Sequence, residues 1–92
     1  MFSTATQINF ADDPRNNRSV LELIASDRPG LLSEVGKVFM REKILLHGAR
    51  IVTVGERAED VFYIADAEDR PLDAAARVRV QSALIDALDP RP

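Results

Sequence analysis

The sequence predicts an α+β domain in which two helices cover one face of an antiparallel sheet. Stretches with an apolar period of two alternate with stretches whose period is about 3.6, which separates strands from helices. The resulting order is strand, strand, helix, strand, strand, helix, and the clearest strand is apolar on both of its faces. A length of 92 residues suits one compact domain with a single core.

The first two elements are expected to be strands joined by a turn-forming loop. Residues Thr6–Phe10 alternate weakly, and residues 12–17 are rich in Asp, Asn and Pro. Residues Ser19–Ala25 form a stronger strand, with Leu21 and Leu23 on one face. Because its other face is also largely apolar, helices should cover one face and another surface at least part of the other.

A helix is predicted after residues 26–30, where the apolar period lengthens. Asp27 is the expected N-cap, and Pro29 suits the first turn, where its missing N–H costs nothing. Gly36 lies beside the apolar stripe, so we expect it to let the helix approach the sheet closely. The stripe itself consists of Leu31, Leu32, Val35, Val38 and Phe39.

The second half of the chain predicts a β-hairpin followed by another helix. Residues 44–54 are strand-like, residues 55–60 are expected to form a loop, and Val61–Ala65 is the second strand. Asp73 is the expected cap of the last helix, which Asp89-Pro90 stops. The apolar face of this helix consists of Ala76, Val80, Ala83, Leu84, Ala87 and Leu88.

This order matches the ferredoxin-like βαββαβ arrangement except that no strand follows the second helix. In that arrangement the fourth strand lies at a sheet edge, antiparallel to the first. We predict that residues 6–10 fold back as a hairpin and fill that edge of a four-stranded antiparallel sheet. Residues 1–5 are expected to be a linker or tail, residues 6–89 the domain, and residues 90–92 a C-terminal tail.

Composition weighs against several classes of function. The formal charge of -3 gives no attraction to phosphate, and no apolar run is long enough to span a membrane, so we expect neither nucleic acid nor membrane as a partner. Aromatic residues make up only 5%, which disfavours an RNA-binding sheet. With no Cys and no signal peptide, a cytoplasmic location is expected.

The chain carries no convincing catalytic or cofactor motif. Its four glycines are dispersed and form neither a P-loop nor a dinucleotide fingerprint. The acidic residues at 66–69 lack the glycine and distal Glu of a calcium loop, which favours a solvated turn. His47 has no nucleophile or carboxylate at a motif spacing, so a structural or ligand-lining role is favoured. We therefore expect no metal, no cofactor and no catalysis.

The strongest candidate site is the turn at residues 26–32, where a central strand meets a helix N-terminus. Free backbone N–H groups and the positive end of the helix dipole can receive a carboxylate, and Asp27 can pair with an amino group. Gly30 allows close approach to the backbone, and Pro29 stiffens the turn. A zwitterionic amino acid would satisfy both charges. The alternative is that Asp27 only caps the helix and Pro-Gly only forms the turn.

Two segments of the sequence resemble a known family. Asp27-Arg28-Pro29-Gly30-Leu31-Leu32, after a hydrophobic strand, resembles the signature of ACT domains, which are ferredoxin-like regulatory modules that bind amino acids and usually pair with one another. Leu46-His47-Gly48-Ala49-Arg50-Ile51, taken with Gly55-Glu56-Arg57, Glu59-Asp60 and Phe62, resembles the last ACT domain of bacterial bifunctional uridylyltransferase/uridylyl-removing enzymes. The likeness extends from about Thr6 to Asp89.

This resemblance implies a regulatory domain that senses an amino acid, with glutamine expected, and controls the two activities of a larger parent enzyme. The implied partners are another ACT domain or a second copy, and the catalytic domains of that enzyme. The site is expected where the turn faces the start of the second strand, of the same chain or of a partner. An architectural module that dimerises or docks without any ligand is the alternative. The expected ligand-binding residues are Asp27, Arg28, Pro29, Gly30, Leu31, Leu32, Leu46, His47, Gly48 and Ala49.

Overall fold

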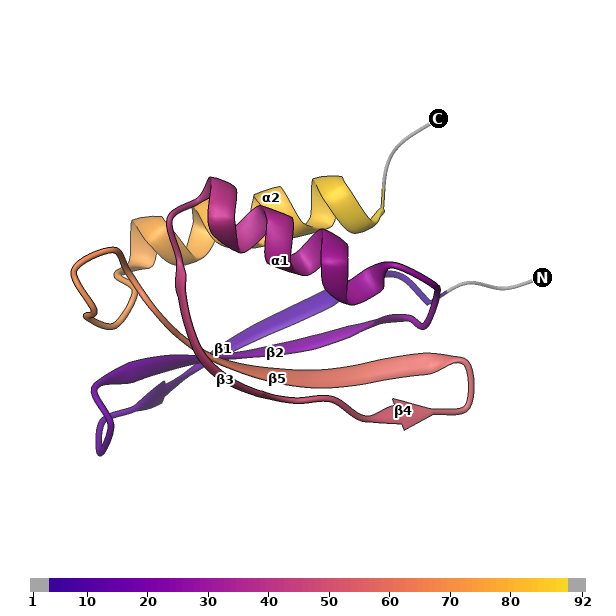
Figure 1. The fold of residues 1–92 in the computed structure, drawn as a ribbon, viewed down its shortest axis with the longest axis horizontal. Coiled ribbons are helices and arrows are strands. Elements are labelled where there is room, and N and C mark those ends of the chain that lie inside the picture. The colour runs from indigo at the N-terminus through magenta and orange to yellow at the C-terminus, as the bar shows by residue number, and fades with distance from the viewer. Residues whose placement is uncertain (1–3, 90–92) are drawn as a thin grey trace.

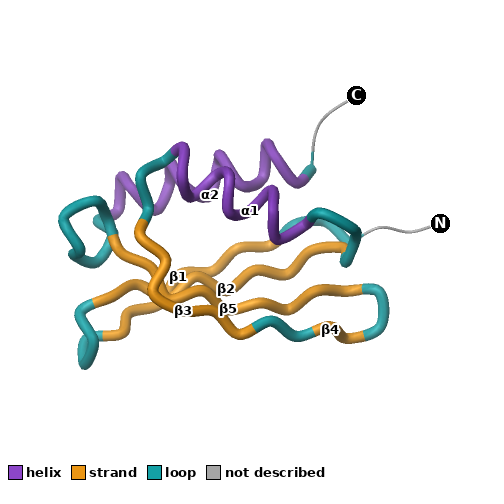
Figure 2. Tube along the Cα trace, in the orientation of Figure 1, coloured by secondary structure: helices purple, strands orange, loops and turns teal. Residues whose placement is uncertain are grey.

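A computed structural model describes residues 4–89, in which two helices lie on one face of an antiparallel sheet (Figure 1). Figure 2 shows the same two layers, with the helices on one side and all strands on the other. Most of the expected tails, residues 1–3 and 90–92, lie outside the described residues. The elements in chain order are β1 (Gln7–Asp13), β2 (Arg18–Ser26), α1 (Leu31–Arg41), β3 (Leu45–Arg50), β4 (Thr53–Val54), β5 (Arg57–Ala65) and α2 (Ala74–Leu88).

The N-terminal strand β1 occupies the sheet edge, as predicted. The strand order is β1-β2-β5-β3, and the two-residue strand β4 also pairs with β5. β1 runs antiparallel to β2, with Ile8 opposite Leu23 and Phe10 opposite Leu21. The strand is longer than predicted, because the pairing continues to Asp13 opposite Arg18. Partner hydrogen bonds therefore keep Asp12 and Asp13 extended although their own propensity favours a turn.

The core lies between the helices and the central strands β2 and β5. Antiparallel pairing places Leu21 opposite Phe62 and Ala25 opposite Ala58, and all four side chains are buried. Phe62 packs edge-to-face against Phe39 of α1, with ring centroids 5.5 Å apart. The helices complete the core with Leu31, Val35, Val38, Ala76, Val80, Leu84 and Leu88.

The predicted strand at 44–54 and loop at 55–60 are both corrected by the structure. The first strand is interrupted at residues 51–52, so that β3 and β4 are separate. Only Gly55 and Glu56 form the turn between β4 and β5. The polar start of β5 is extended because it pairs on both sides, with Arg57 opposite Ser26 and Ala58 opposite Thr53. Pairing with two neighbouring strands thus keeps the start of β5 extended, although its composition favours a loop.

The second helix begins as predicted, whereas the first does not. The Asp73 carboxylate caps α2 by accepting a hydrogen bond from the Ala76 N–H at 2.8 Å. The N-cap of α1 is Gly30, without a side-chain cap, so the prediction that Asp27 caps this helix is wrong. Asp27 still belongs to the extended chain, because its N–H donates to the Glu56 carbonyl at 2.9 Å. No helix in residues 4–89 has the length and apolar character to cross a membrane.

The expectation that Gly36 allows close helix–sheet contact is also wrong. Gly36 is exposed, and a Cβ added there would meet no atom within 4 Å beyond its own helix backbone and chain neighbours. The apolar stripe of α1 is narrower than expected, because Leu32 is exposed as well, and Leu31, Val35, Val38 and Phe39 alone are buried.

We expect Phe10→Ala to lower the free energy of unfolding by about 1–2 kcal/mol, measured by urea denaturation. The half-buried ring packs against the core, and the Arg77 guanidinium lies 5.5 Å from its centroid. Asn9→Ala, at an exposed position of the same strand, should change stability by less than about 0.5 kcal/mol. Equal unfolding midpoints for the two variants would contradict the packing of β1 on the core.

Candidate ligand-binding site

A cavity of about 200 Å³ lies between the turn before α1 and the β4–β5 hairpin. The β2–β5 register brings these segments together, since Ser26 at the end of β2 lies opposite Arg57 at the start of β5. The volume is below the roughly 300–1,000 Å³ of drug-sized pockets, so the cavity suits a small molecule. Its lining residues are Asp27, Arg28, Gly30, Leu31, Leu32, Ser33, Ile51, Thr53, Ala58 and Asp60.

The turn before α1 presents free backbone donors. Gly30 has φ 83, a left-handed conformation that glycine adopts without a steric penalty. One of the expected free donors is occupied, because the N–H of Leu31 donates to the Arg28 carbonyl at 3.2 Å. In the described chain, no hydrogen-bond acceptor is found for the N–H groups of Leu32 and Ser33. These donors, at the positive end of the helix dipole, can receive a carboxylate.

Asp60 contributes a buried carboxyl group to the wall of the same cavity. The residue is only 2% exposed, and its Oδ1 accepts a hydrogen bond from the Val52 N–H at 3.2 Å. Its Oδ2 is shielded from solvent and has no hydrogen-bond partner among residues 4–89. Burial raises the pKa of Asp60, the Val52 hydrogen bond offsets part of this effect, and the negative charge of Asp27 raises the pKa further.

Arg28 connects the turn to both helices. Its guanidinium donates to the Leu88 carbonyl at the end of α2 at 2.9 Å and forms an ion pair with Glu34 in the first turn of α1. These two contacts already occupy the guanidinium of Arg28, one of the expected ligand-binding residues. Arg28 therefore positions the turn, whereas Pro29 and Gly30 shape the backbone that faces the cavity.

The second predicted segment, Leu46 to Ala49, does not face the turn within one chain. β3 pairs Leu46 with Ile64 and Ala49 with Phe62, whereas the turn adjoins Ala58. Ile64 and Ala58 are about 20 Å apart along β5, at roughly 3.3 Å per residue. Within one chain, residues 46–49 are therefore not part of the cavity lining, which begins on this side of the sheet at Ile51.

His47 lies at the opposite end of the sheet from the cavity. Its Nε2 is 2.6 Å from Oδ1 of Asp69, in the loop that follows β5. The pairing of β3 with β5 shifts between Leu46 and Gly48, so His47 sits at an irregular point of the edge strand. This contact gives His47 a structural role in connecting β3 to the loop.

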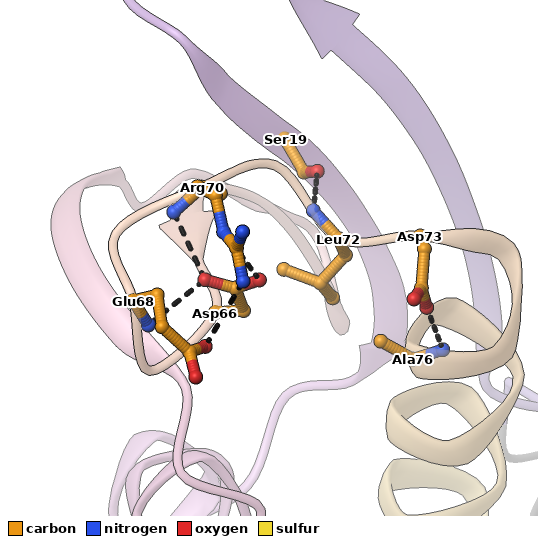
Figure 3. A network of polar contacts seen from close by, with 7 residues as sticks. All are labelled: Ser19, Asp66, Glu68, Arg70, Leu72, Asp73 and Ala76. Carbon is orange, nitrogen blue, oxygen red and sulfur yellow. Dashed lines mark hydrogen bonds and ion pairs between the residues drawn. The ribbon is translucent and has the colours of Figure 1, made fainter.

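The acidic loop after β5 is closed by its own hydrogen bonds (Figure 3). Oδ1 of Asp66 accepts hydrogen bonds from the N–H groups of Glu68 and Arg70 at 3.0 and 2.9 Å. The Leu72 N–H then donates to the buried Ser19 hydroxyl at 2.9 Å, which fastens the loop to β2. Asp66 is thus used by the loop itself. Among residues 4–89, no three or more His, Asp or Glu side chains are grouped to hold a metal ion.

Sequence reasoning missed several residues of the cavity. Ser33, Ile51, Thr53 and Ala58 were not singled out, and Asp60 entered only through a resemblance. The available signal is a period of two in β5, where Ala58, Asp60, Phe62 and Ile64 face the core. Because residues 55–60 were assigned to a loop, a carboxylate in this apolar row was not recognised.

Comparisons with known proteins match this chain to one family and one type of enzyme. The ACT domain family matches residues 19–80. The bifunctional uridylyltransferase/uridylyl-removing enzyme of Methylococcus capsulatus is 58% identical over 86 residues, which cover 92% of this chain. The enzymes of the same name from Psychrobacter cryohalolentis and Xanthomonas campestris are 47% and 45% identical, over 98% and 97% of this chain. The chain spans about 10% of the length of each of these relatives.

We expect Asp60→Asn to stabilise the fold at neutral pH, because the amide still accepts from the Val52 N–H but no buried charge has to form. When folding raises the pKa of a carboxyl group, the fold becomes less stable as the pH rises from the ordinary pKa of 3.8 through the raised pKa. The free energy of unfolding of the variant should therefore increase relative to that of the parent across this pH range. The two values should converge well below pH 3.8. Urea titrations against pH measure this, with exposed Asp86→Asn as control. A constant difference at all pH values would contradict the assignment.

Replacing Gly30 and Gly36 by alanine should change the free energy of unfolding in opposite directions. Gly30→Ala should lower the free energy of unfolding by about 1 kcal/mol, because its left-handed φ is unfavourable for alanine. Gly36→Ala, in an exposed helix interior, should raise it by about 0.5–1 kcal/mol. Thermal or urea unfolding of both variants tests this, and shifts of the same sign would contradict the geometry of the turn.

Proposed function

Since this chain belongs to the ACT domain family, we propose that it is a regulatory domain that senses an amino acid. The observation that carries the proposal is the pair of free N–H groups, of Leu32 and Ser33, at a cavity sized for a small molecule. A ligand carboxylate would accept hydrogen bonds from them, and the carboxylate of Asp27 would attract the ligand's positive end. The turn Asp27–Leu32 is the centre of the proposed site.

Glutamine is the ligand that we propose. Its side chain is uncharged and polar, and the cavity offers the hydroxyl groups of Ser33 and Thr53 beside the apolar side chains of Leu31, Ile51 and Ala58. An amide can hydrogen-bond to such hydroxyls without a compensating charge. The relatives are named for uridylyl transfer and removal. We propose that this domain controls both activities in a larger cytoplasmic parent protein by reporting glutamine to its catalytic domains.

Another ACT domain or a second copy is the proposed partner. β3 is an outer strand of the sheet, and exposed apolar side chains occur on β3 itself, on the chain that follows it through β4, and in the first turn of α1. A partner packed there would bring Leu46, His47, Gly48 and Ala49 of one copy to the turn of another, which a single chain does not do. The exposed apolar residues are Leu32, Leu45, Leu46, Ile51, Val52 and Val54.

The competing function is an architectural module that joins subunits or domains without a ligand. The same exposed apolar surface favours it, because burial of such a surface stabilises an interface whether or not a ligand is present. Dimerisation therefore does not separate the two functions. Ligand binding does.

Calorimetric titration with L-glutamine and a panel of other amino acids tests the proposal. We expect saturable binding in the millimolar range that is selective for glutamine. Backbone chemical-shift changes should concentrate at residues 27–33 and 51–60. Absence of heat with every amino acid would favour the architectural module, and shifts concentrated at residues 66–71 would reject this cavity as the site.

A further inference from the structure

We propose that Asp60 is the residue that selects an α-amino acid, because its unpaired Oδ2 accepts a hydrogen bond from the ammonium group of the ligand. The N–H groups of Leu32 and Ser33 would hold the carboxylate of the same molecule. This inference rests on the proposed amino-acid-sensing function and identifies the group that recognises the positive end of the ligand.

The fold itself uses only one oxygen of Asp60. Oδ1 receives the Val52 N–H at the break between β3 and β4, a bond that an asparagine carbonyl would accept equally well. Within the described part of the chain, Oδ2 is buried without any donor, which costs free energy of folding. Asp60 also lies opposite Leu23, in a row of buried apolar residues where a leucine or valine would stabilise the core. A structural role alone therefore does not account for the second oxygen or for the charge.

The charges around Asp60 favour a cation at this wall of the cavity. On the cavity side the charged neighbours are Asp27 and Arg28, and Arg28 is held by Glu34 and by the Leu88 carbonyl. A second hollow that Asp60 borders is lined by the charged residues Glu22, Arg50 and Glu59.

Burial is the main cause of the raised pKa of Asp60, and repulsion from the negative charge of Asp27 adds to it. An ammonium group beside both would relieve this repulsion. Leu32 and Ser33, with their free N–H groups, line the same cavity, so its lining offers groups that complement both charges of a zwitterion.

Ligand binding should depend on pH through Asp60. Only the ionised carboxylate attracts an ammonium group fully, and burial together with Asp27 holds the pKa of Asp60 above its ordinary value. The bound ammonium would lower that pKa, so affinity should fall as the pH decreases through it. Oδ2 is buried, so binding requires a small adjustment of the residues around it. The Val52 N–H, bonded to the same carboxyl group, is the nearest backbone reporter of that adjustment.

The test compares L-glutamine with glutaramate, the analogue that lacks only the α-amino group, on the 92-residue chain. The parent should bind glutamine more tightly than glutaramate. Asp60→Asn should bind glutamine roughly 10- to 100-fold more weakly, as expected for loss of a charge-assisted hydrogen bond, and should bind glutaramate with little change. Asp86→Asn removes one exposed carboxylate from α2 and should behave as the parent. The affinity of Asp60→Asn for glutamine should also not fall at low pH, in contrast to that of the parent.

The outcomes separate this inference from the function on which it rests. If the parent binds glutamine and Asp60→Asn retains the same affinity and the same preference over glutaramate, the role of Asp60 is rejected and the sensing function stands. If the parent binds no amino acid, both are rejected. If Asp60→Asn does not fold, the parent alone decides, because equal affinity for glutamine and glutaramate would show that no residue recognises the ammonium group.

Discussion

The antiparallel register of β2 and β5, with Leu21 opposite Phe62 and Leu23 opposite Asp60, fixes the position of every other element. The turn before α1 and the β4–β5 hairpin lie at the same end of the sheet (Figure 1). Residues of both segments line the cavity. At the other end Ser19 lies opposite Ile64, and its hydroxyl fastens the chain that leads into α2. Both loops are therefore positioned by the central strand pair.

The cost of this arrangement is concentrated at Asp60. A carboxyl group in the buried row of β5 gives up hydration and leaves one oxygen without a donor, whereas its neighbours Ala58 and Phe62 contribute apolar contacts. Proteins retain such costly groups most often at functional sites. The Asp60 carboxyl group borders the same cavity as the free N–H groups of α1. The two form one surface that carries opposite charges.

The ends of the described chain are also tied to the turn. The Ser26 hydroxyl donates to the Thr4 carbonyl and accepts from its N–H, and the Arg28 guanidinium donates to the Leu88 carbonyl. Thr6 in turn donates to the Asp89 carboxylate from both its N–H and its hydroxyl. A movement of the turn would therefore alter contacts of the first strand and of the end of α2. Such contacts connect the turn that lines the cavity to both ends of the described chain.

The sequence by itself determined the class of fold and the edge position of the first strand, and it pointed to the turn that we propose as the centre of the site. These features follow from local periods, from the element order and from residues with strong backbone preferences, such as Pro29 and Gly30. Local propensity could not give the lengths of β1 and β5 or the start of α1, because hydrogen bonds to neighbouring strands decide them. Only the tertiary structure placed Asp60 in the wall of the cavity and separated Leu46 to Ala49 from it, since strand register, which joins residues distant in sequence, determines both.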